Sequence, residues 1–259
     1  SIHFLISPLI RQIWRGAERL VAKSARESEM INAIDPRVAC LLIPNGVDAN
    51  IFRPTHLAPD DGPLKLLCVG RLIERKGQHH LIDAVKRLTD EGIDVRLDLV
   101  GTGDARAANE AQVVRLGLTD RIRFLGYIPR ADIPSHYAAA HVFVLPSYNE
   151  GMSVALLEAM ASGLAVVVTP AGGTPELVED QINGFVFNWA DVDRLTSLLR
   201  CLAQDRSLVK RMGQESRNRS AEFSWDRAAL HYMELIQQLP SSLAPLANAS
   251  LNAEAERKA

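Results

Sequence analysis

The stretch that decides the fold runs from residue 66 to residue 100 and reads LLCVGRLIERKGQHHLIDAVKRLTDEGIDVRLDLV. It begins with a short apolar run at residues 66–69, which ends at Gly70. Apolar residues then recur at helical spacing over residues 77–88, and a second apolar run follows at residues 95–100. A strand, a helix and a strand in this order are typical of a parallel sheet that is covered by helices.

The same alternation continues along the chain. Further apolar runs, each flanked by Gly, Pro or Asn, lie at residues 122–124, 141–145, 165–168 and 185–187. Helical spacing is found in a segment that ends at residue 116 and at residues 132–140, 153–161, 174–178, 192–203, 207–219 and 226–239. We therefore predict an α/β fold in which residues 64–187 form one Rossmann-like parallel sheet with helices on both faces. Residues 241–259 are rich in Ala, Ser and Asn, and we expect them to be a flexible tail.

The composition is that of an ordinary globular protein. Apolar residues make up 47% and charged residues 23% of the 259 residues, which excludes a disordered or collagen-like chain. The formal net charge of −2 argues against nucleic acid as a partner. The scattered cysteines, Cys40, Cys68 and Cys201, are typical of reduced thiols and not of a disulfide framework or a zinc cluster. We therefore expect a cytoplasmic protein.

The first residues of the chain allow three interpretations. Residues 1–10 form an apolar stretch that Arg11, Arg15 and Arg19 follow, whereas a signal peptide would place its charges before such a stretch. The pattern of residues 10–15 fits a helix that packs on protein. It also fits an amphipathic helix that touches a membrane, which would place the protein at the inner face of that membrane. In the third interpretation the protein begins upstream, because the chain lacks an initiator Met.

Ligands of open parallel sheets bind beyond the carboxyl ends of the strands, so the residues that follow each strand are candidate site residues. After the first predicted strand, the loop at residues 70–77 carries Arg71 and Lys76. A pair of cations at this edge suits a diphosphate. Arg and Lys on loops are also commonly only solvated, and this pair by itself does not identify a site.

The segment Pro146-Ser-Tyr-Asn-Glu-Gly-Met-Ser153 follows a predicted strand and leads into a helix. Gly151 allows a ligand to approach the backbone, and the first amides of the helix direct unpaired N–H groups toward it, which is typical of a phosphate site. Glu158 lies in an almost wholly apolar part of this helix, where a carboxylate needs a partner such as a ribose diol. In the alternative interpretation Glu150 caps the helix and Glu158 is solvated.

Glu150 and Glu158, with seven residues between them, resemble the Glu-x7-Glu motif of retaining GT-B glycosyltransferases, in particular glycosyltransferase family 4. Other segments that resemble the family occur in the family's order, and the likeness runs over residues 20–239. These segments are Ile43-Pro-Asn-Gly-Val-Asp48, Phe52-Arg-Pro54, Val69-Gly-Arg71, Lys76-Gly77, Ala159-Met-Ala-Ser-Gly163, Gly172-Gly-Thr-Pro-Glu-Leu-Val178 and Asn183-Gly184.

The resemblance implies a role for each candidate residue. Arg71 and Lys76 would hold the diphosphate of a nucleotide sugar of the UDP or GDP type. Glu150 would contact hydroxyls of the donor sugar, and Glu158 would bind the ribose. The backbone amides that approach the phosphate and the sugar would be those of Gly151, Met152, Ser153 and Val154.

The resemblance also implies the reaction. A sugar would pass from the nucleotide sugar to a glycan or lipid-linked acceptor of polysaccharide biosynthesis, with its anomeric configuration retained. The base of the donor would lie beside Tyr127 and Ile128. Because Arg71, Lys76 and the helix N-terminus would stabilise the departing diphosphate, we expect no metal and no other cofactor.

The family places an acceptor-binding domain before the Ile43-Pro44 segment, and residues 1–43 are too few for it. We expect residues 1–43 to be a remnant of that domain, residues 44–223 the nucleotide-sugar-binding domain and residues 224–240 a crossover helix. The chain by itself would then be incomplete for catalysis. Two alternatives stay open: a module that binds nucleotide sugar without transferring it, and a GT-B sugar-nucleotide epimerase.

Two further features look like metal sites. Asp191-Val-Asp193 resembles the metal-binding Asp-x-Asp of another glycosyltransferase fold, but Asp191 stands just before a helical run and is expected to cap it. His79 and His80 are adjacent in a predicted helix, so we expect their side chains to point to different faces. We therefore predict no metal site.

Overall fold

The computed structural model describes residues 2–54 and 61–238, with the side chains of residues 8–54 and 61–238. The predicted tail at residues 241–259 lies outside the described residues. The chain divides into two compact units. The smaller unit is formed by Ser1–Pro44 together with Trp225–Ala259, and the larger one by Asn45–Ser224.

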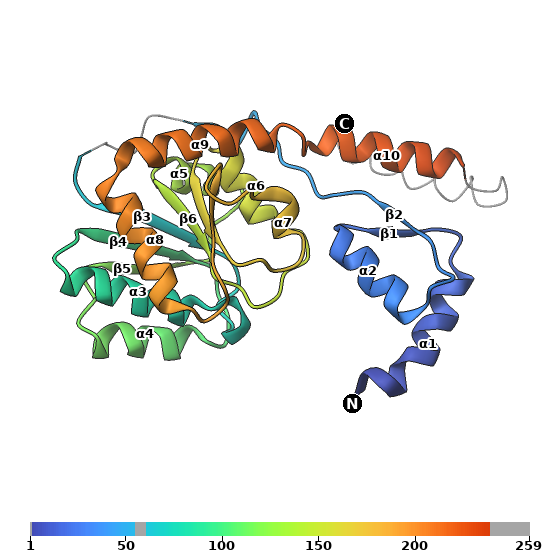
Figure 1. Ribbon diagram of the computed structural model, residues 1–259, viewed down its shortest axis with the longest axis horizontal. Helices are drawn as coiled ribbons and strands as arrows, with labels where there is room; N and C mark the ends of the chain where they lie inside the picture. The colour runs from blue at the N-terminus through green and yellow to red at the C-terminus, as the bar shows by residue number, and fades with distance from the viewer. Residues whose placement is uncertain (1, 55–60, 239–259) are drawn as a thin grey trace. The chain divides into compact units, whose positions relative to one another are not determined.

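The larger unit is built on a six-stranded sheet (Figure 1). Its strands follow the order β5-β4-β3-β6-β7-β8, and each neighbouring pair is parallel. The strands are β3 (Leu64–Val69), β4 (Val95–Val100), β5 (Ile122–Gly126), β6 (Val142–Leu145), β7 (Ala165–Val168) and β8 (Gly184–Val186). The parallel sheet predicted from the apolar runs is therefore confirmed. Because strand order reverses between β3 and β6, the loops that follow these two strands flank a switch point, where such sheets bind ligands.

Two apolar clusters lie on the two faces of this sheet. One face is covered by α3 (Gln78–Asp90), α4 (Arg106–Arg115), α8 (Val192–Gln204) and part of α9 (Arg206–Ser220). The other is covered by α5 (Ile133–Ala138), α6 (Val154–Ala161) and α7 (Thr174–Leu177) (Figure 1). Helices on both faces were predicted, and the bounds differ from the prediction by at most a few residues.

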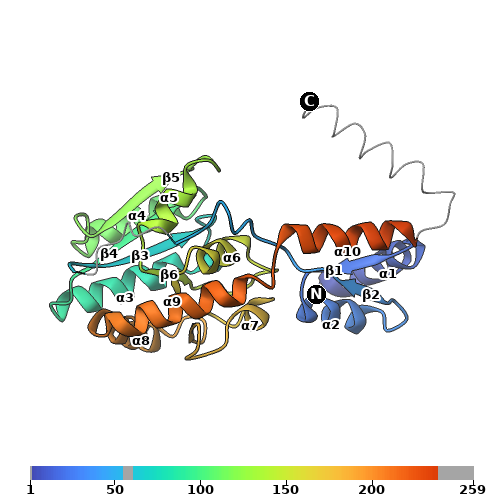
Figure 2. The same cartoon turned by 90° about the horizontal axis from the view of Figure 1, so that it is seen from above.

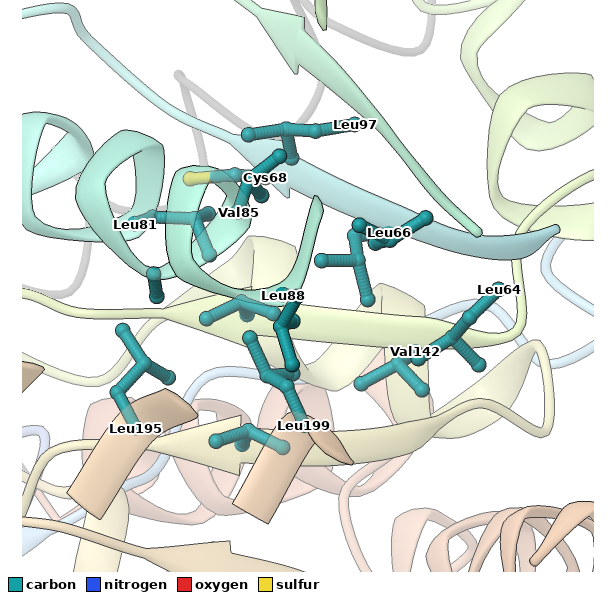
Figure 3. Close-up of a cluster of buried hydrophobic side chains, with 14 of the residues drawn as sticks. Leu64, Leu66, Cys68, Leu81, Val85, Leu88, Leu97, Val142, Leu195 and Leu199 are labelled. Carbon is teal, nitrogen blue, oxygen red and sulfur yellow. The ribbon is translucent and has the colours of Figure 1, made fainter. Parts of the chain in front are cut away.

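Strand β3 explains why its sequence reads as a continuous apolar run. Leu64, Leu66 and Cys68 point into the cluster under α3 and α8, whereas Leu67 points into the cluster under α6. Successive side chains of a strand alternate between faces, and here both faces are buried. Figure 3 shows the first cluster, in which side chains of α3 and α8 meet those of β3, β4 and β6.

The smaller unit contains α1 (Ile2–Gly16), β1 (Leu20–Ala22), α2 (Ala25–Ile34), β2 (Cys40–Leu42) and α10 (Trp225–Gln237). The two short strands pair in parallel. Ala228 and Leu235 of α10 pack with Ile43 in a cluster that also includes Val21 of β1. Figure 2 shows α10 beside β1. The bounds of β1, α2 and β2 were not predicted, because three-residue strands carry too few residues for an apolar pattern and because Ile31 is the buried residue of α2. Within the described part of the chain, no helix combines the length and the apolar character that crossing a membrane requires.

Candidate functional site

The loops that follow β3 and β6 pack closely and are hydrogen-bonded to each other at the switch point of the sheet. Gly77 has a positive φ of 68°, and a Cβ atom at this position would lie 2.1 Å from the carbonyl oxygen of Pro146. Only glycine therefore fits there without moving the backbone. The amide of Tyr148 donates a hydrogen bond of 2.7 Å to the carbonyl of Arg75. These contacts fix the residue before α3 against the segment that leads into α6.

The loop after β7 packs on the same segment. Gly172 has a φ of 56°, and a Cβ atom there would lie 2.1 Å from the carbonyl oxygen of Glu150. The amide of Gly173 donates a hydrogen bond of 2.7 Å to the carbonyl of Gly151. Three loops thus hold the backbone around Glu150 in one conformation.

The structure brings together the two charged residues at the centre of the predicted site. Lys76 Nζ donates to Glu150 Oε1 at 2.5 Å, and their side chains are only 16% and 9% exposed. The ion pair offsets the hydration that each charge loses on burial. An isolated charge at this depth would lose its hydration without compensation. Burial raises the pKa of the neighbouring Cys68 thiol to about 12, so this sulfur stays protonated and is no nucleophile.

Arg71 lies at the same edge of the sheet, directly after Gly70. Its side chain is exposed, and its carbonyl accepts a hydrogen bond of 2.9 Å from Gln78 Nε2. The buried Gln78 thereby fixes the backbone of the loop that carries the exposed guanidinium. The loop after β3 consequently carries both an exposed cation, Arg71, and a cation in an ion pair, Lys76.

The N-terminus of α6 is capped by Ser153 and not by Glu150. Ser153 has extended backbone angles, and its hydroxyl accepts from the amide of Leu156 at 3.3 Å. The alternative interpretation of Glu150 as a helix cap is therefore wrong. Asn45 Nδ2 donates to the carbonyl of Met152 at 2.9 Å, which fixes the backbone just before the helix. The amides of residues 151–154 precede or begin the helix, at its positive end.

Glu158 is not a solvated helical residue. It is half-buried on α6, and its Oε2 accepts a hydrogen bond of 2.9 Å from the hydroxyl of Tyr137. Burial raises the pKa of Glu158, while the Tyr137 hydrogen bond and the charge of Arg130 act in the opposite direction. Burial also raises the pKa of Tyr137 well above its ordinary value, and the nearby Glu158 carboxylate adds to this effect. Tyr137 is therefore a fixed donor that orients one oxygen of Glu158.

Tyr127 and Ile128 follow β5, which is an outermost strand of the sheet. Gly126 has a φ of 69°, and its carbonyl accepts from the amide of Gly101 at 2.8 Å. This turn leaves the Tyr127 side chain 78% exposed and packs Ile128 against the cluster under α6. The structure thus places both residues at the carboxyl end of the sheet, two strands from β3.

The two features that resemble metal sites have other partners. Asp191 caps α8, with its Oδ1 accepting from the amide of Arg194 at 2.8 Å, so the predicted capping role is confirmed. Asp193 forms an ion pair with Arg87. Among the described residues, no group of three or more His, Cys, Asp or Glu side chains is arranged to hold a metal.

The prediction for His79 and His80 is wrong. Their ring centroids lie 3.9 Å apart, so the two side chains contact each other. Adjacent residues are turned by about 100° around a helix, but the long side chains can still lean toward each other at its first turn. His80 also packs edge-to-face on Trp189, at 5.2 Å between ring centroids.

Residues 51–219 match a family model described as Glycosyl transferases group 1. This chain belongs to that family. The match includes the loops after β3, β6 and β7, together with Glu150 and Glu158.

Curated relatives of this group 1 chain are longer than it is. It is 31% identical over 229 residues to a "GDP-mannose-dependent alpha-(1-6)-phosphatidylinositol monomannoside mannosyltransferase" from Mycolicibacterium smegmatis, covering 81% of the chain and 59% of the relative. It is 31% identical over 237 residues to a "D-inositol 3-phosphate glycosyltransferase" from Streptomyces avermitilis, covering 84% and 51%. The chain thus spans somewhat more than half the length of these relatives.

Solved structures of similar proteins have the same fold. The sucrose-phosphate synthase of Thermosynechococcus elongatus has a TM-score of 0.82 at 27% identity, over 90% of this chain and 61% of the other. HepE from Anabaena, solved in complex with UDP and glucose, has a TM-score of 0.81 at 26% identity, over 92% and 69%. These neighbours are GT-B glycosyltransferases, and the α/β fold implied by the resemblance is confirmed.

Two residues that shape the site in this group 1 chain were not assigned a role from the sequence. Tyr137 was seen only as part of a helix, although a tyrosine at a buried position needs a partner for its hydroxyl, as Glu158 does for its carboxylate. Asn45 was seen only as part of the Ile43-Pro-Asn-Gly-Val-Asp48 segment. Its long-range contact to Met152 leaves no signal in the spacing of the sequence.

Proposed function

We propose that this group 1 chain binds a nucleoside diphosphate sugar at the carboxyl ends of β3 and β6. The observation that carries the proposal is the meeting of Lys76, Glu150 and the N-terminus of α6 at the switch point of the sheet. Arg71 and Lys76 would hold the diphosphate with the amides of residues 151–154. Glu150 would turn its carboxylate to hydroxyls of the donor sugar.

The ribose and the base would lie farther along the same edge. Glu158 Oε2 accepts from Tyr137, which leaves its other oxygen to accept from a ribose hydroxyl. Tyr127 is exposed at the end of β5 and offers an aromatic face to the base. The family resemblance supports both assignments, and the half-buried position of Glu158 adds a physical reason for a polar partner.

The reaction proposed for the whole protein is transfer of the sugar with its anomeric configuration retained. Negative charge grows on the departing diphosphate in the transition state. Fixed cations and helix amides stabilise such charge without having to reorganise. Arg71, Lys76 and the first turn of α6 would supply this stabilisation, so the proposal includes no metal and no other cofactor.

The acceptor is proposed to be a glycan or a lipid-linked sugar. Relatives include a phosphatidylinositol monomannoside mannosyltransferase and a putative colanic acid biosynthesis glycosyltransferase, both named for such products. We propose a cytoplasmic location, with association at the inner face of a membrane. The exposed Leu9 and Ile13 on α1, beside Arg11, support that association.

Calorimetric titration tests the donor site. The parent chain is titrated with UDP, GDP, UDP-glucose and GDP-mannose, without metal and again with magnesium. Arg71→Ala and Lys76→Ala should each weaken every ligand by about tenfold to a hundredfold, the effect of losing a charge-assisted hydrogen bond of about 1.5–3 kcal/mol.

The matched control for these two variants is Arg115→Ala, which removes an exposed arginine from the end of α4, away from the switch point. It should bind every ligand as the parent does. Binding that appears only with magnesium, or that survives in both Arg71→Ala and Lys76→Ala, would show that the metal-free diphosphate site is wrong. Transfer to an acceptor would then separate a transferase from a binding module, and donor isomerisation without an acceptor would identify an epimerase.

A further inference from the structure

Two exposed aromatic rings lie beside the proposed donor site. Tyr148 follows β6 and is 65% exposed, and Trp189 follows β8 and is 40% exposed. Their ring centroids are 5.0 Å apart with an angle of 66° between the planes. Together with Ile73, Glu74 and Arg75 they line an open depression of about 540 Å³. This volume lies within the range of small-molecule sites.

The backbone holds both rings in place at some cost. The amide of Tyr148 is bound to the carbonyl of Arg75, so the ring starts from a fixed loop. Trp189 precedes Ala190, which has a φ of 65°, a left-handed conformation that a residue with a Cβ atom rarely adopts. His80 packs on Trp189 with an angle of 84° between the ring planes. An apolar ring of this size would expose less surface to water if it folded inward, but the turn presents it outward.

The depression combines two kinds of contact that a pyranose sugar requires. The aromatic faces carry partial negative charge and attract the C–H groups on the face of a sugar ring. Glu74 and Arg75 lie on the same rim and are exposed, so they can accept from and donate to sugar hydroxyls. A purely apolar partner would form no hydrogen bonds with these two charged groups.

The position of the two rings favours the acceptor sugar over the donor sugar as the ligand of the depression. Glu150 lies two residues after Tyr148 and points to Lys76, where the donor sugar is proposed to bind. Tyr148 points to solvent. In a transfer reaction the acceptor must lie next to the donor sugar. The depression is lined by Arg75, which directly precedes Lys76, and by Tyr148, whose amide is bonded to the carbonyl of Arg75.

We propose that the depression lined by Tyr148 and Trp189 binds a pyranose ring of the acceptor glycan. This inference rests on the proposed sugar transfer and adds a binding site for the second substrate. The larger unit would thereby contribute to acceptor recognition, with stacking by the two rings and hydrogen bonds from Arg75 and Glu74.

Ligand-observed NMR titration tests the proposal with defined saccharides: methyl α-mannoside, α-1,6-mannotriose and maltotriose. The parent chain should bind at least one oligosaccharide at millimolar concentration. Trp189→Ala and Tyr148→Ala should each weaken that binding about tenfold or more. Trp189→Phe keeps an aromatic face and should retain most of it. Trp225→Ala is the matched control, because Trp225 is 39% exposed and lies in the smaller unit, and it should bind as the parent does.

Three results would overturn the proposal: no oligosaccharide binding by the parent, equal binding by the parent and Trp189→Ala, or equal losses in Trp189→Ala and Trp225→Ala. Titration of each variant with UDP and GDP separates this proposal from the donor site. Retained nucleoside diphosphate binding without saccharide binding refutes the acceptor site alone. Saccharide binding that depends on Trp189, without any nucleotide binding, refutes the donor site and leaves the saccharide site standing.

Discussion

The carboxylate of Glu150 lies 2.5 Å from the ammonium group of Lys76, although 74 positions separate the two residues in the chain. Without a ligand each charge neutralises the other. A diphosphate that binds Lys76 would have to share this cation with Glu150, and Glu150 would then be free to accept from other groups. The pair therefore couples the proposed diphosphate contact to the proposed sugar contact.

Glu150→Gln should separate these two contacts. The variant removes the anion that competes for Lys76, so UDP or GDP should bind at least as tightly as to the parent. The sugar-bearing form should lose about tenfold in affinity, because a neutral amide accepts more weakly from sugar hydroxyls. Calorimetry with both ligands measures the difference, and Glu179→Gln serves as a surface control. Equal losses for both ligands would mean that Glu150 contacts the nucleotide and not the sugar.

Lys76→Met should lower the free energy of unfolding by about 1–3 kcal/mol, because it leaves Glu150 charged at 9% exposure. The double variant Lys76→Met/Glu150→Gln should recover part of this loss. Urea unfolding of the single and double variants gives the coupling energy. The exposed pair Arg87–Asp193 provides the matched cycle and should couple by less than about 1 kcal/mol. Equal coupling in the two cycles would contradict the buried character of the first pair.

Stability should depend on pH through Glu158. Burial raises its pKa in the folded chain, so between the ordinary value of 4.5 and the raised value the folded state holds more protons than the unfolded state. The free energy of unfolding then falls as pH rises through this window. Glu158→Gln cannot lose a proton and should become more stable relative to the parent as pH rises. Urea unfolding at a series of pH values checks this, and a difference that does not change with pH would refute it.

Tyr137→Phe should raise the pKa of Glu158 further, because it removes a hydrogen bond that favours the carboxylate. The window in which stability falls should therefore extend to higher pH. Nucleoside diphosphate binding needs an ionised Glu158 to accept from the ribose. As the pH is lowered, binding to the variant should therefore begin to weaken at a higher pH than binding to the parent. Calorimetry across the same pH series measures the shift. An unchanged pH profile would mean that Glu158 does not contact the ribose.

Arg217 connects three parts of the larger unit. Its guanidinium donates to the carbonyls of Phe52 and Ala161, and at 3.2 Å to that of Ala49. Arg217→Ala should lower the free energy of unfolding by about 1.5–3 kcal/mol, because these carbonyls lose a charged donor. Arg211→Ala, an exposed position on the same helix, should change it by less than about 0.5 kcal/mol. Equal effects of the two variants would contradict this role.

The sequence predicted the local elements of the larger unit well. Residues 95–100 and 165–168 were predicted as strands with the bounds that β4 and β7 have. Such runs are readable because strands buried on both faces are almost wholly apolar, and because Gly, Pro and Asn mark their ends. Glu150 was a candidate because it follows a predicted strand, and Glu158 because it is a carboxylate in an almost wholly apolar helix; their roles came from the resemblance of the pair to the Glu-x7-Glu motif.

Side-chain partners depended on the tertiary structure. The Lys76–Glu150 ion pair, the Tyr137 hydrogen bond to Glu158 and the contact of Tyr148 with Trp189 each join residues from different loops or helices. Periodicity reports which face of an element is buried, but it carries no information on which element lies opposite. The sequence by itself therefore determined the strands, the helices and the candidate residues at their ends. The order in which the strands pair decided which of those residues meet, because it makes β3 and β6 neighbours at the edge where all the parallel strands of the sheet end.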